Sequence, residues 1–271
     1  MESSNQYISG TEGIFFDVPD DIYRKAEGVS QTSLKWMEPT PAHYRARMLQ
    51  PLEASEAQII GKITHAGVLE GKTEGQYVVK PDGMTFATKE GKAWKAEQTL
   101  PILTKEQADN IAGMTDAVKN HLLCQTILHG SKREVSGFKR DERTGLMLKA
   151  RADVLAIDVA GNTVIPDLKT CQVGEVGPKE FSKSIFNWGY HIQAAHYLDV
   201  FGATSFVFIA IEKEPPYAIA IYYLSAEAIA SGRAKRDSLL AQFAKCKAEN
   251  HWPSYPLDIQ EIGLPAWANK S

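Results

Sequence analysis

The sequence predicts an α/β protein whose mixed central β-sheet is flanked by helices, with helical additions at the N-terminal end. Three features predict this fold class. Residues 146–156 place an apolar side chain at every second position, which is typical of a half-buried strand. Residues 204–212 are strongly apolar and suit a central strand. Residues 178–201 and 225–250 each have the length and composition of a long helix.

The length of 271 residues and the hydrophobic content of 44% predict one elaborated domain with its own core. Residues 1–29 mix Gly, Asp and Pro with few periodic positions, so we expect an extended arm. A helical region is expected over residues 30–130, followed by the core over residues 131–250. The tail over residues 251–271 contains three prolines and cannot form a regular element. We therefore expect the tail to lie over a neighbouring surface or subunit.

Residues that start and stop helices divide the region over 30–130. Ser30 fits an N-cap, and Pro39 and Pro41 end the helix that it begins. Thr104 and Gln107 have the spacing of a capping box. The expected elements are helices over 30–38, 43–49, 53–71 and 104–123 and a short strand over 77–79.

The core begins with consecutive strands joined by turns. Turn residues at 141–145 and 158–162 separate the first three strands, which favours a meander of neighbouring antiparallel strands. The expected strands of the core cover residues 134–139, 146–156, 163–170, 204–212 and 217–224.

Two carboxylates and a lysine are predicted to share one face of this meander. A turn at 158–162 pairs Asp153 with Asp167, with Cβ atoms roughly 5 Å apart, and Lys169 projects from the same face. Adjacent carboxylates repel each other, and a hard divalent cation such as Mg²⁺ removes this repulsion. Pro166 cannot donate a ladder hydrogen bond, so we expect a bulged or frayed strand beside the carboxylates. The alternative is the charged outer face of an ordinary hairpin.

Asp153 and the run Pro166-Asp167-Leu168-Lys169 resemble the PD-(D/E)xK nuclease core, with Asp in the second acidic position. The run Gly61-Lys-Ile-Thr-His-Ala-Gly-Val-Leu-Glu70 resembles the GxxxHxxLE pattern of RecB-type nucleases, with one more residue between His65 and Leu69. Gln193-Ala-Ala-His-Tyr197 is similar to their QxxxY pattern. In size, motif order and the two ends of the chain, the sequence is similar to the RecE-like exonuclease VIII family of phages and prophages.

The resemblance implies a metal-dependent nuclease site. It assigns Asp153 and Asp167 to the binding of Mg²⁺, for which Mn²⁺ can substitute. The Leu168 carbonyl and His65 are the further ligands that it implies. The alternative for His65 is a structural residue at the polar border of a buried helix stripe.

The resemblance also implies roles for three side chains around the metal. Lys169 is expected to position or activate the attacking water. Gln193 and Tyr197 lie four residues apart and share one helix face. They are expected to orient the scissile strand or to support the site.

Two further groups are candidates for ligands or for contact with DNA. The turn at 141–145 places Glu134 near Arg151, where Glu134 is a third acidic ligand, an ion-pair partner of Arg151 or surface charge. Arg151 is also a candidate for contact with DNA. A basic segment with an aromatic residue could hold DNA by phosphate contact and base stacking, and its alternative is a solvated helix face. The residues of this segment are Lys89, Lys92, Trp94 and Lys95.

The cysteines and the net charge exclude several classes of protein. Cys124, Cys171 and Cys246 are isolated and odd in number, which indicates reduced thiols and excludes a four-cysteine iron–sulfur cluster. A net charge of −3 gives no global attraction for DNA, so any basic channel must be local. The sequence has neither a signal peptide nor an apolar run that could span a bilayer, which predicts a cytoplasmic protein without membrane contact.

The resemblance implies an exonuclease that digests linear double-stranded DNA from 5′ ends and leaves 3′ single strands for an annealing protein. It also implies a homotetrameric ring, which would converge local basic residues on one duplex. The tail aromatics Trp252, Tyr255 and Trp267 are candidates for the subunit interface, with packing inside the subunit as the alternative. The rival functions are a restriction-type or repair-type endonuclease and a catalytically inactive DNA-binding module. The intact set of two Asp and one Lys argues against the inactive module.

Overall fold

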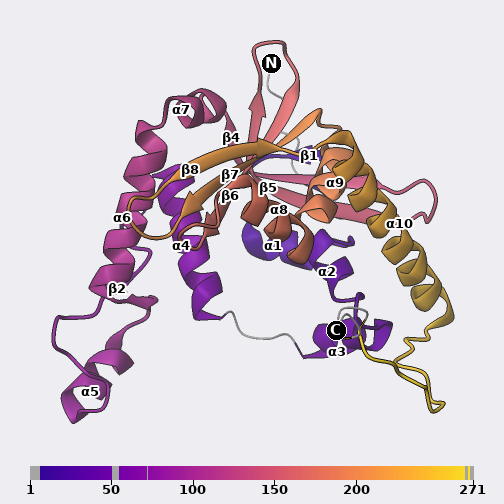
Figure 1. Ribbon diagram of the computed structural model, residues 1–271, viewed down its shortest axis with the longest axis horizontal. Coiled ribbons are helices and arrows are strands. Elements are labelled where there is room, and N and C mark those ends of the chain that lie inside the picture. Colours follow the sequence, from indigo (N-terminus) through magenta and orange to yellow (C-terminus); the bar gives the residue numbers. More distant parts are fainter. Residues whose placement is uncertain (1–6, 51–54, 72, 266–267, 269–271) are drawn as a thin grey trace.

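A mixed β-sheet of six strands forms the centre of the computed structural model, which describes residues 7–50, 55–71, 73–265 and 268 (Figure 1). The strand order is β1-β4-β5-β6-β7-β8. Neighbouring strands are antiparallel, except that β6 and β7 are parallel. The strands are β1 Gly13–Phe15, β4 Lys132–Arg140, β5 Met147–Ile157, β6 Thr163–Cys171, β7 Ser205–Glu212 and β8 Ile219–Tyr223. The predicted α/β class with a mixed sheet is confirmed.

Helices cover both faces of the sheet, as successive residues of β7 demonstrate. Phe208 and Ala210 pack in one hydrophobic cluster with α2 Gln31–Lys35, α8 Pro178–Asn187, α9 Tyr190–Phe201 and α10 Ala226–Glu249. Ile209 and Ile211 point to the other face. There they pack with α4 Glu56–Glu70, α6 Lys105–Asn120 and α7 Leu122–Leu128. Among the helices that the structure describes, none is both long and apolar enough to cross a membrane.

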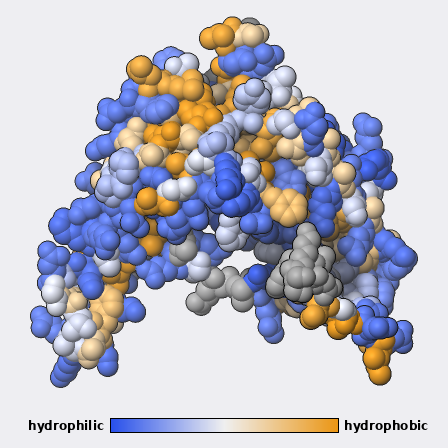
Figure 2. All heavy atoms as spheres, in the orientation of Figure 1, coloured by the Kyte–Doolittle hydropathy of each residue, from blue (hydrophilic) through white to orange (hydrophobic). Residues whose placement is uncertain are grey.

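The remaining elements are short and lie outside these two layers of helices. They are α1 Asp20–Lys25, α3 Pro41–Leu49, α5 Lys89–Glu97 and the parallel pair β2 Val78–Val79 and β3 Ile102–Leu103. In Figure 1, α4 and α6 descend from the sheet on one side toward α5, and α10 descends on the other side toward α3. Figure 2, in the same orientation, shows the surface hollowed between these two sides.

Side-chain caps fix several helix starts where the sequence predicts them. Ser30 forms a capping box with Ser33 at α2, and Thr104 forms one with Gln107 at α6. Ser225 accepts a hydrogen bond from a backbone N–H in the first turn of α10. These caps stabilise the helices because the first N–H groups of a helix have no partner within it.

The segment expected as an extended arm differs from that expectation where it is described. β1 pairs with β4, and α1 follows β1. Phe15 and Val18 are buried with Phe138 in a third hydrophobic cluster. β1 is a strand because β4 offers it an unpaired edge, and local sequence patterns do not reveal such an edge.

The stretch over residues 178–201 forms two helices instead of the single helix expected from the sequence. α8 ends at Asn187, and Trp188 is its C-cap. Gly189 then adopts a left-handed φ of 68° before α9 begins at Tyr190. Glycine adopts this conformation without the steric cost that a Cβ atom imposes. The turn therefore lets α8 and α9 take separate directions over the sheet.

β5 and β6 pair in the register that the turn at 158–162 predicts. Continued along both strands, this register would set Asp153 opposite Asp167. The ladder contains only the pairs Ala156–Val164 and Ile157–Thr163, next to the turn. Pro166, which has no N–H to donate, lies beyond these two pairs on the β5 side of β6, and on the other side it is in register with Val207 of β7. The strands thus leave their ladder before they reach the carboxylates, in agreement with the predicted fraying.

Cys124, Cys171 and Cys246 are buried free thiols. Burial raises the pKa of Cys124 and the pKa of Cys171 to about 11. Burial also raises the pKa of Cys246. These three residues are therefore neutral thiols at physiological pH, as expected for reduced core cysteines.

The tail after α10 first packs against the subunit and is then exposed. Trp252 stacks on Tyr44 and lies edge-on to Phe243, so this candidate interface residue packs within the subunit. Tyr255 is exposed, and Trp267 lies outside the described residues. Beyond Trp252, the exposed large apolar side chains of the described tail are Leu257, Ile259, Ile262 and Leu264.

Candidate active site

β6 and α9 bring three polar side chains into direct contact. Lys169 Nζ lies 2.6 Å from Asp167 Oδ2. Gln193 donates from Nε2 to Asp167 Oδ1 at 2.9 Å, and its Oε1 accepts from Lys169 Nζ at 3.1 Å. The carboxylate, the ammonium and the amide therefore form a closed set of contacts between the strand and the helix.

β5 and α4 bring Asp153 and His65 together. The Nδ1 atom of His65 lies 2.8 Å from Asp153 Oδ2. An ionised carboxylate only accepts hydrogen bonds, so Nδ1 carries the proton of this contact. α4 is anchored by the buried side chains of Ile63 and Leu69, and His65 lies beside this stripe, where the sequence predicts it. The side chain of Glu70, the last residue of the same motif, lies outside the described residues.

The charged groups of the site shift one another's pKa. Burial raises the pKa of Asp167 against the opposing charge of Lys169, and the charge of Asp153 adds to the rise. Burial also acts to raise the pKa of Asp153, but the hydrogen bond and charge of His65 outweigh it and lower that pKa. Burial acts to lower the pKa of His65, and Asp153 reverses this effect, so the pKa of His65 is raised. Asp167 is therefore the carboxylate whose charge is least stabilised by the protein itself.

Two tyrosines of α9 complete this part of the site. Tyr197 donates from its hydroxyl group to the Arg151 carbonyl at 3.0 Å and so ties α9 to β5. The ring centroid of Tyr190 lies 4.5 Å from Lys169 Nζ, a cation–π contact. The sequence reasoning missed Tyr190. The sequence signal for it is Gly189, because a glycine often ends a helix and the next residue can then begin another one. In the structure Gly189 has a left-handed φ and Tyr190 begins α9.

Arg151 and Glu134 form an ion pair on the neighbouring strands. Arg151 Nε lies 2.6 Å from Glu134 Oε2, and the guanidinium carbon lies 5.3 Å from the ring centroid of Tyr23. Glu134 has a φ of 50°, and the ladder between β4 and β5 lacks the pair of Glu134 with Asp153, although its register is the same on both sides of this gap. Of the three interpretations of Glu134, this geometry fits the ion pair with Arg151.

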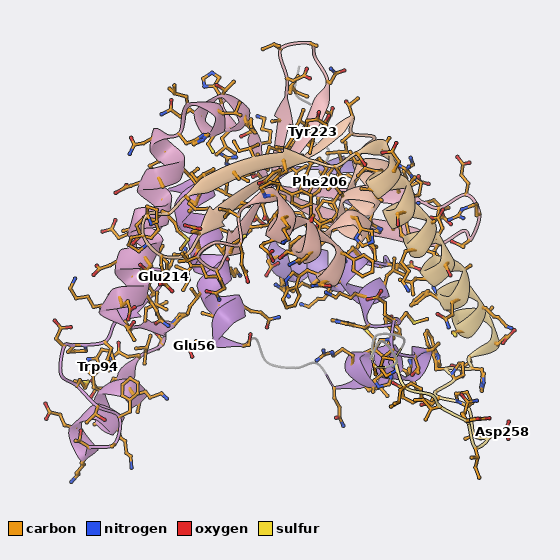
Figure 3. The ribbon with its side chains drawn as sticks, viewed as in Figure 1. Glu56, Trp94, Phe206, Glu214, Tyr223 and Asp258 are labelled. Carbon is orange, nitrogen blue, oxygen red and sulfur yellow. The ribbon has the colours of Figure 1, made fainter. Side chains whose placement is uncertain are left out.

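The basic segment of α5 lies away from these residues, at the far end of one side of the molecule (Figure 3, where Trp94 is labelled). Trp94 stacks on Phe86 with ring centroids 6.4 Å apart. Lys95 Nζ lies 5.1 Å from the Phe86 ring centroid. The structure therefore does not bring Lys89, Lys92, Trp94 and Lys95 together with the carboxylates.

The donor atoms of the site fit a hard divalent cation in their chemistry. Asp153 and Asp167 offer carboxylate oxygens, and His65 and the Leu168 carbonyl are the other candidate donors. Asp167 Oδ2 is buried against the Lys169 ammonium. The charge of Asp153 still raises the pKa of Asp167, and a cation held by both carboxylates would remove this repulsion. The described residues contain no group of three or more His, Cys, Asp or Glu side chains already arranged to hold a metal ion.

Residues 30–261 match the family of the PDDEXK-like domain of unknown function, DUF3799. The chain belongs to this family. The predicted resemblance to the PD-(D/E)xK nuclease core is thereby confirmed, and the family supports nuclease activity for this DUF3799 chain. Among proteins with curated descriptions, none matches the sequence.

The fold of the DUF3799 chain also occurs in solved structures. A protein from Eubacterium rectale, named "Putative exonuclease", aligns with a TM-score of 0.60 and 14% identity over 94% of this chain and 99% of that chain. A phage-related exonuclease from Haemophilus somnus 129PT aligns with a TM-score of 0.36 and 13% identity over 82% of this chain and 96% of that chain. The first alignment shows a common fold, and the second score is too low to carry an argument.

Proposed function

We propose that the chain is a metal-dependent exonuclease that hydrolyses phosphodiester bonds of linear double-stranded DNA. The proposal is supported by Asp167 and Lys169, which are in contact on β6, and by Asp153 of the neighbouring strand β5, whose charge acts on both of them. An inactive binding module has no need for two adjacent carboxylates and a buried lysine. A nuclease uses the carboxylates to hold a cation and the lysine to stabilise developing negative charge.

Asp153 and Asp167 would hold Mg²⁺, with the Leu168 carbonyl and His65 as further candidate ligands and Mn²⁺ as a substitute. The ion, when bound, polarises the phosphate and lowers the pKa of bound water. Lys169 donates hydrogen bonds from its ammonium group toward the attacking water or the phosphate oxygens. Gln193 fixes both Asp167 and Lys169 through its two amide atoms.

We further propose that the duplex approaches through the hollow between the two sides of the molecule (Figure 2). Lys89, Lys92 and Lys95 of α5 lie on one of these sides and would contact the phosphates, with Trp94 beside them. Arg151 lies two residues before Asp153 in the sequence, and it would contact DNA if its ion pair with Glu134 opens. Local contacts of this kind suit a chain whose net charge is −3.

By resemblance to RecE-like exonucleases, digestion would begin at 5′ ends and leave 3′ single strands for an annealing protein in recombination. Linear duplexes labelled at either the 5′ or the 3′ end test this polarity, in Mg²⁺ and in EDTA. We expect mononucleotides or short products from the labelled 5′ end in Mg²⁺ and intact DNA in EDTA. Covalently closed circular DNA should remain intact. Cleavage of the circle would favour a restriction-type or repair-type endonuclease, and binding without cleavage would favour the inactive module.

His65 has two separable roles in the proposed site, and two substitutions distinguish them. The amide nitrogen of His65→Asn mimics Nδ1 and keeps a donor for Asp153, whereas a metal-binding nitrogen at the Nε2 position is lost. If His65 is a ligand, we expect His65→Asn and His65→Ala each to raise the Mg²⁺ concentration for half-maximal rate by about 10- to 100-fold. Mn²⁺ should recover part of the lost rate, because it binds nitrogen and oxygen sites more tightly.

If His65 only orients Asp153, His65→Asn should retain nearly the full affinity for Mg²⁺ while His65→Ala loses it. If His65 has only a structural role, the His65 variants should have lower melting temperatures than the wild type. Their Mg²⁺ concentration for half-maximal rate should then equal that of the wild type. His121→Ala is a matched control, because His121 accepts a backbone hydrogen bond at the start of α7, outside the site.

We propose that the working form is a homotetrameric ring and that the tail contributes to its interface. Leu257, Ile259, Ile262 and Leu264 are exposed on the subunit, and such a group of apolar side chains is typical of an interaction surface. Truncation after Pro256 removes them but keeps Trp252 and its packing on Tyr44. We expect light scattering to give a multiple of 29.9 kDa for the full chain and a smaller multiple for the truncated chain.

The truncated enzyme should also digest DNA in shorter runs, since an open assembly releases its duplex more readily. Trp252→Ala is the control for folding, because it removes packing inside the subunit and should lower the melting temperature. A full-length monomer that digests long DNA in one encounter would contradict the ring.

A further inference from the structure

The turn between α8 and α9 presents two large aromatic side chains to solvent. Phe186 is 76% exposed and Trp188 is 60% exposed. Trp188 is the C-cap of α8 and Gly189 follows it with a left-handed φ, while the Phe186 ring stacks on His191 with centroids 5.9 Å apart. Aromatic side chains gain much from burial, so two exposed rings within three residues indicate a surface that binds a partner.

This turn lies next to the candidate catalytic residues. Tyr190, two residues after Trp188, holds its ring 4.5 Å from Lys169 Nζ. Tyr190 and Trp188 both line an open cavity of about 570 Å³. Thr170, the residue after Lys169, lines the same cavity. The cavity therefore connects the surroundings of Lys169 with the indole ring of Trp188.

Lysines accompany the aromatic rings around this cavity. Lys183 and Lys213 line it together with Glu175 and Glu180, and Lys183 Nζ is paired with Glu180 Oε2 at 2.7 Å. Lys35 of α2 donates to the Trp188 carbonyl at 3.0 Å, and its Nζ lies 5.5 Å from the indole centroid. Lysines interleaved with aromatic rings suit single-stranded nucleic acid, because the lysines contact phosphates while the rings stack on bases.

We propose that Trp188 and Phe186 form a stacking platform for an unpaired nucleotide of the DNA strand whose phosphate lies at Lys169. Inside a duplex, neighbouring base pairs cover both faces of every base, and at a blunt end the one free face of the terminal pair points along the helix axis and not to the side of the strand. An aromatic side chain at the side of the strand can therefore stack only on a base that has left its pair. The platform thus makes the opening of terminal base pairs a step of digestion. This inference rests on the proposed nuclease function and adds that the DNA strand at the site carries an unpaired base.

Binding in EDTA tests the platform without hydrolysis. The probes are a fluorescein-labelled oligothymidylate and a blunt duplex of the same length. We expect Trp188→Ala to weaken binding of the oligothymidylate by roughly 5- to 100-fold, the loss for one stacked base, and to change duplex binding by about twofold or less. Trp188→Phe should retain most of the affinity, because phenylalanine also stacks. Tyr223→Ala, at an exposed aromatic position of β8 (Figure 3), is the matched control and should bind both probes as the wild type does.

Cleavage provides an independent measurement. In Mg²⁺, the wild type should have a lower KM for duplexes with mismatched terminal pairs than for fully paired duplexes, because the mismatches are already open. Trp188→Ala and Phe186→Ala should raise KM for the mismatched duplex and remove this preference, while kcat changes little. Both side chains are exposed, so melting temperatures should match that of the wild type.

The outcomes separate the platform from the nuclease proposal. If the wild type cleaves linear DNA but Trp188→Ala binds the oligothymidylate as tightly as the wild type, the platform is wrong and the turn is better explained as a protein-binding surface. The platform would also be wrong if Trp188→Ala lost the same factor of affinity for the oligothymidylate and for the duplex. Loss of stacking on an unpaired base would weaken only the binding of the oligothymidylate. A wild type that neither binds nor cleaves DNA would overturn both proposals.

Discussion

Asp167→Asn is expected to reduce the rate of DNA hydrolysis at least about a thousandfold, which corresponds to about 4 kcal/mol of transition-state stabilisation. The substitution preserves the size of the side chain and an oxygen that can accept from Gln193. It removes the negative charge beside Lys169 and with it the charge that would hold a divalent cation. Initial rates on a labelled linear duplex in Mg²⁺ measure the effect. Asp153→Asn and Lys169→Ala should cause losses of the same order.

The melting temperatures of these variants show whether a loss of activity comes from the missing catalytic group or from unfolding. Asp167 and Lys169 form an ion pair in which both side chains are largely buried. Removal of one partner leaves the other charge uncompensated, which costs about 3–5 kcal/mol when the pair is fully buried. We therefore expect Lys169→Ala to melt below the wild type. The double variant Asp167→Asn/Lys169→Met should recover much of the melting temperature without recovering activity.

The control for this prediction is Asp109→Asn, which removes an exposed carboxylate that pairs with Lys105 on α6. Exposed ion pairs contribute about 0–1 kcal/mol, so this variant should keep both its rate and its melting temperature. Full activity of Asp167→Asn, or hydrolysis by the wild type in EDTA, would contradict the assigned site.

Gly232→Ala is expected to destabilise the fold by about 3 kcal/mol and to lower Tm by roughly 6–12 °C. Gly232 lies in α10 where this helix crosses α9. A Cβ atom at this position would overlap the backbone carbonyl of His191. Backbone cannot move aside as a flexible side chain can, so the two helices must separate. Because α9 also carries Gln193, we expect the nuclease rate to fall together with stability. Thermal melting followed by circular dichroism measures the first effect.

Gly61→Ala is the matched control for this substitution. Gly61 also lies within a helix, α4, and the position of its Cβ atom is open space. Alanine is favoured over glycine inside helices by about 1 kcal/mol, so Gly61→Ala should melt at or above the wild type. If Gly232→Ala melted at the same temperature as Gly61→Ala, the close contact of α9 with α10 would not be a determinant of stability.

Much of the sheet and the centre of the site can be predicted from the sequence because their signals are local. Strict alternation over residues 146–156 and turn residues at 158–162 predict the register of β5 with β6, which the pairs Ala156–Val164 and Ile157–Thr163 confirm. The spacing of Gln193 and Tyr197 predicts a shared helix face, and both side chains do contact the strands that carry the site. In each case a pattern within a few residues of the sequence is sufficient to predict which side chains share a face.

The features that the sequence did not reveal depend on distant contacts or on one backbone angle. β1 exists because β4 has a free edge, and Tyr23 reaches Arg151 only after α1 is placed by that pairing. The helical composition of residues 178–201 hides the break at Gly189, although a glycine after a helix is a known stop signal. Tyr190 and the exposed Trp188 follow from this single angle and were therefore missed.

The burial of all three native cysteines has a practical consequence for observing this protein at work. Neutral, buried thiols react slowly with maleimide dyes, so the wild-type chain should incorporate very little dye in a labelling reaction. Leu257→Cys would then introduce one reactive thiol in the exposed tail. A donor dye on some copies and an acceptor dye on others would report subunit exchange by energy transfer, without removal of any native residue from the core.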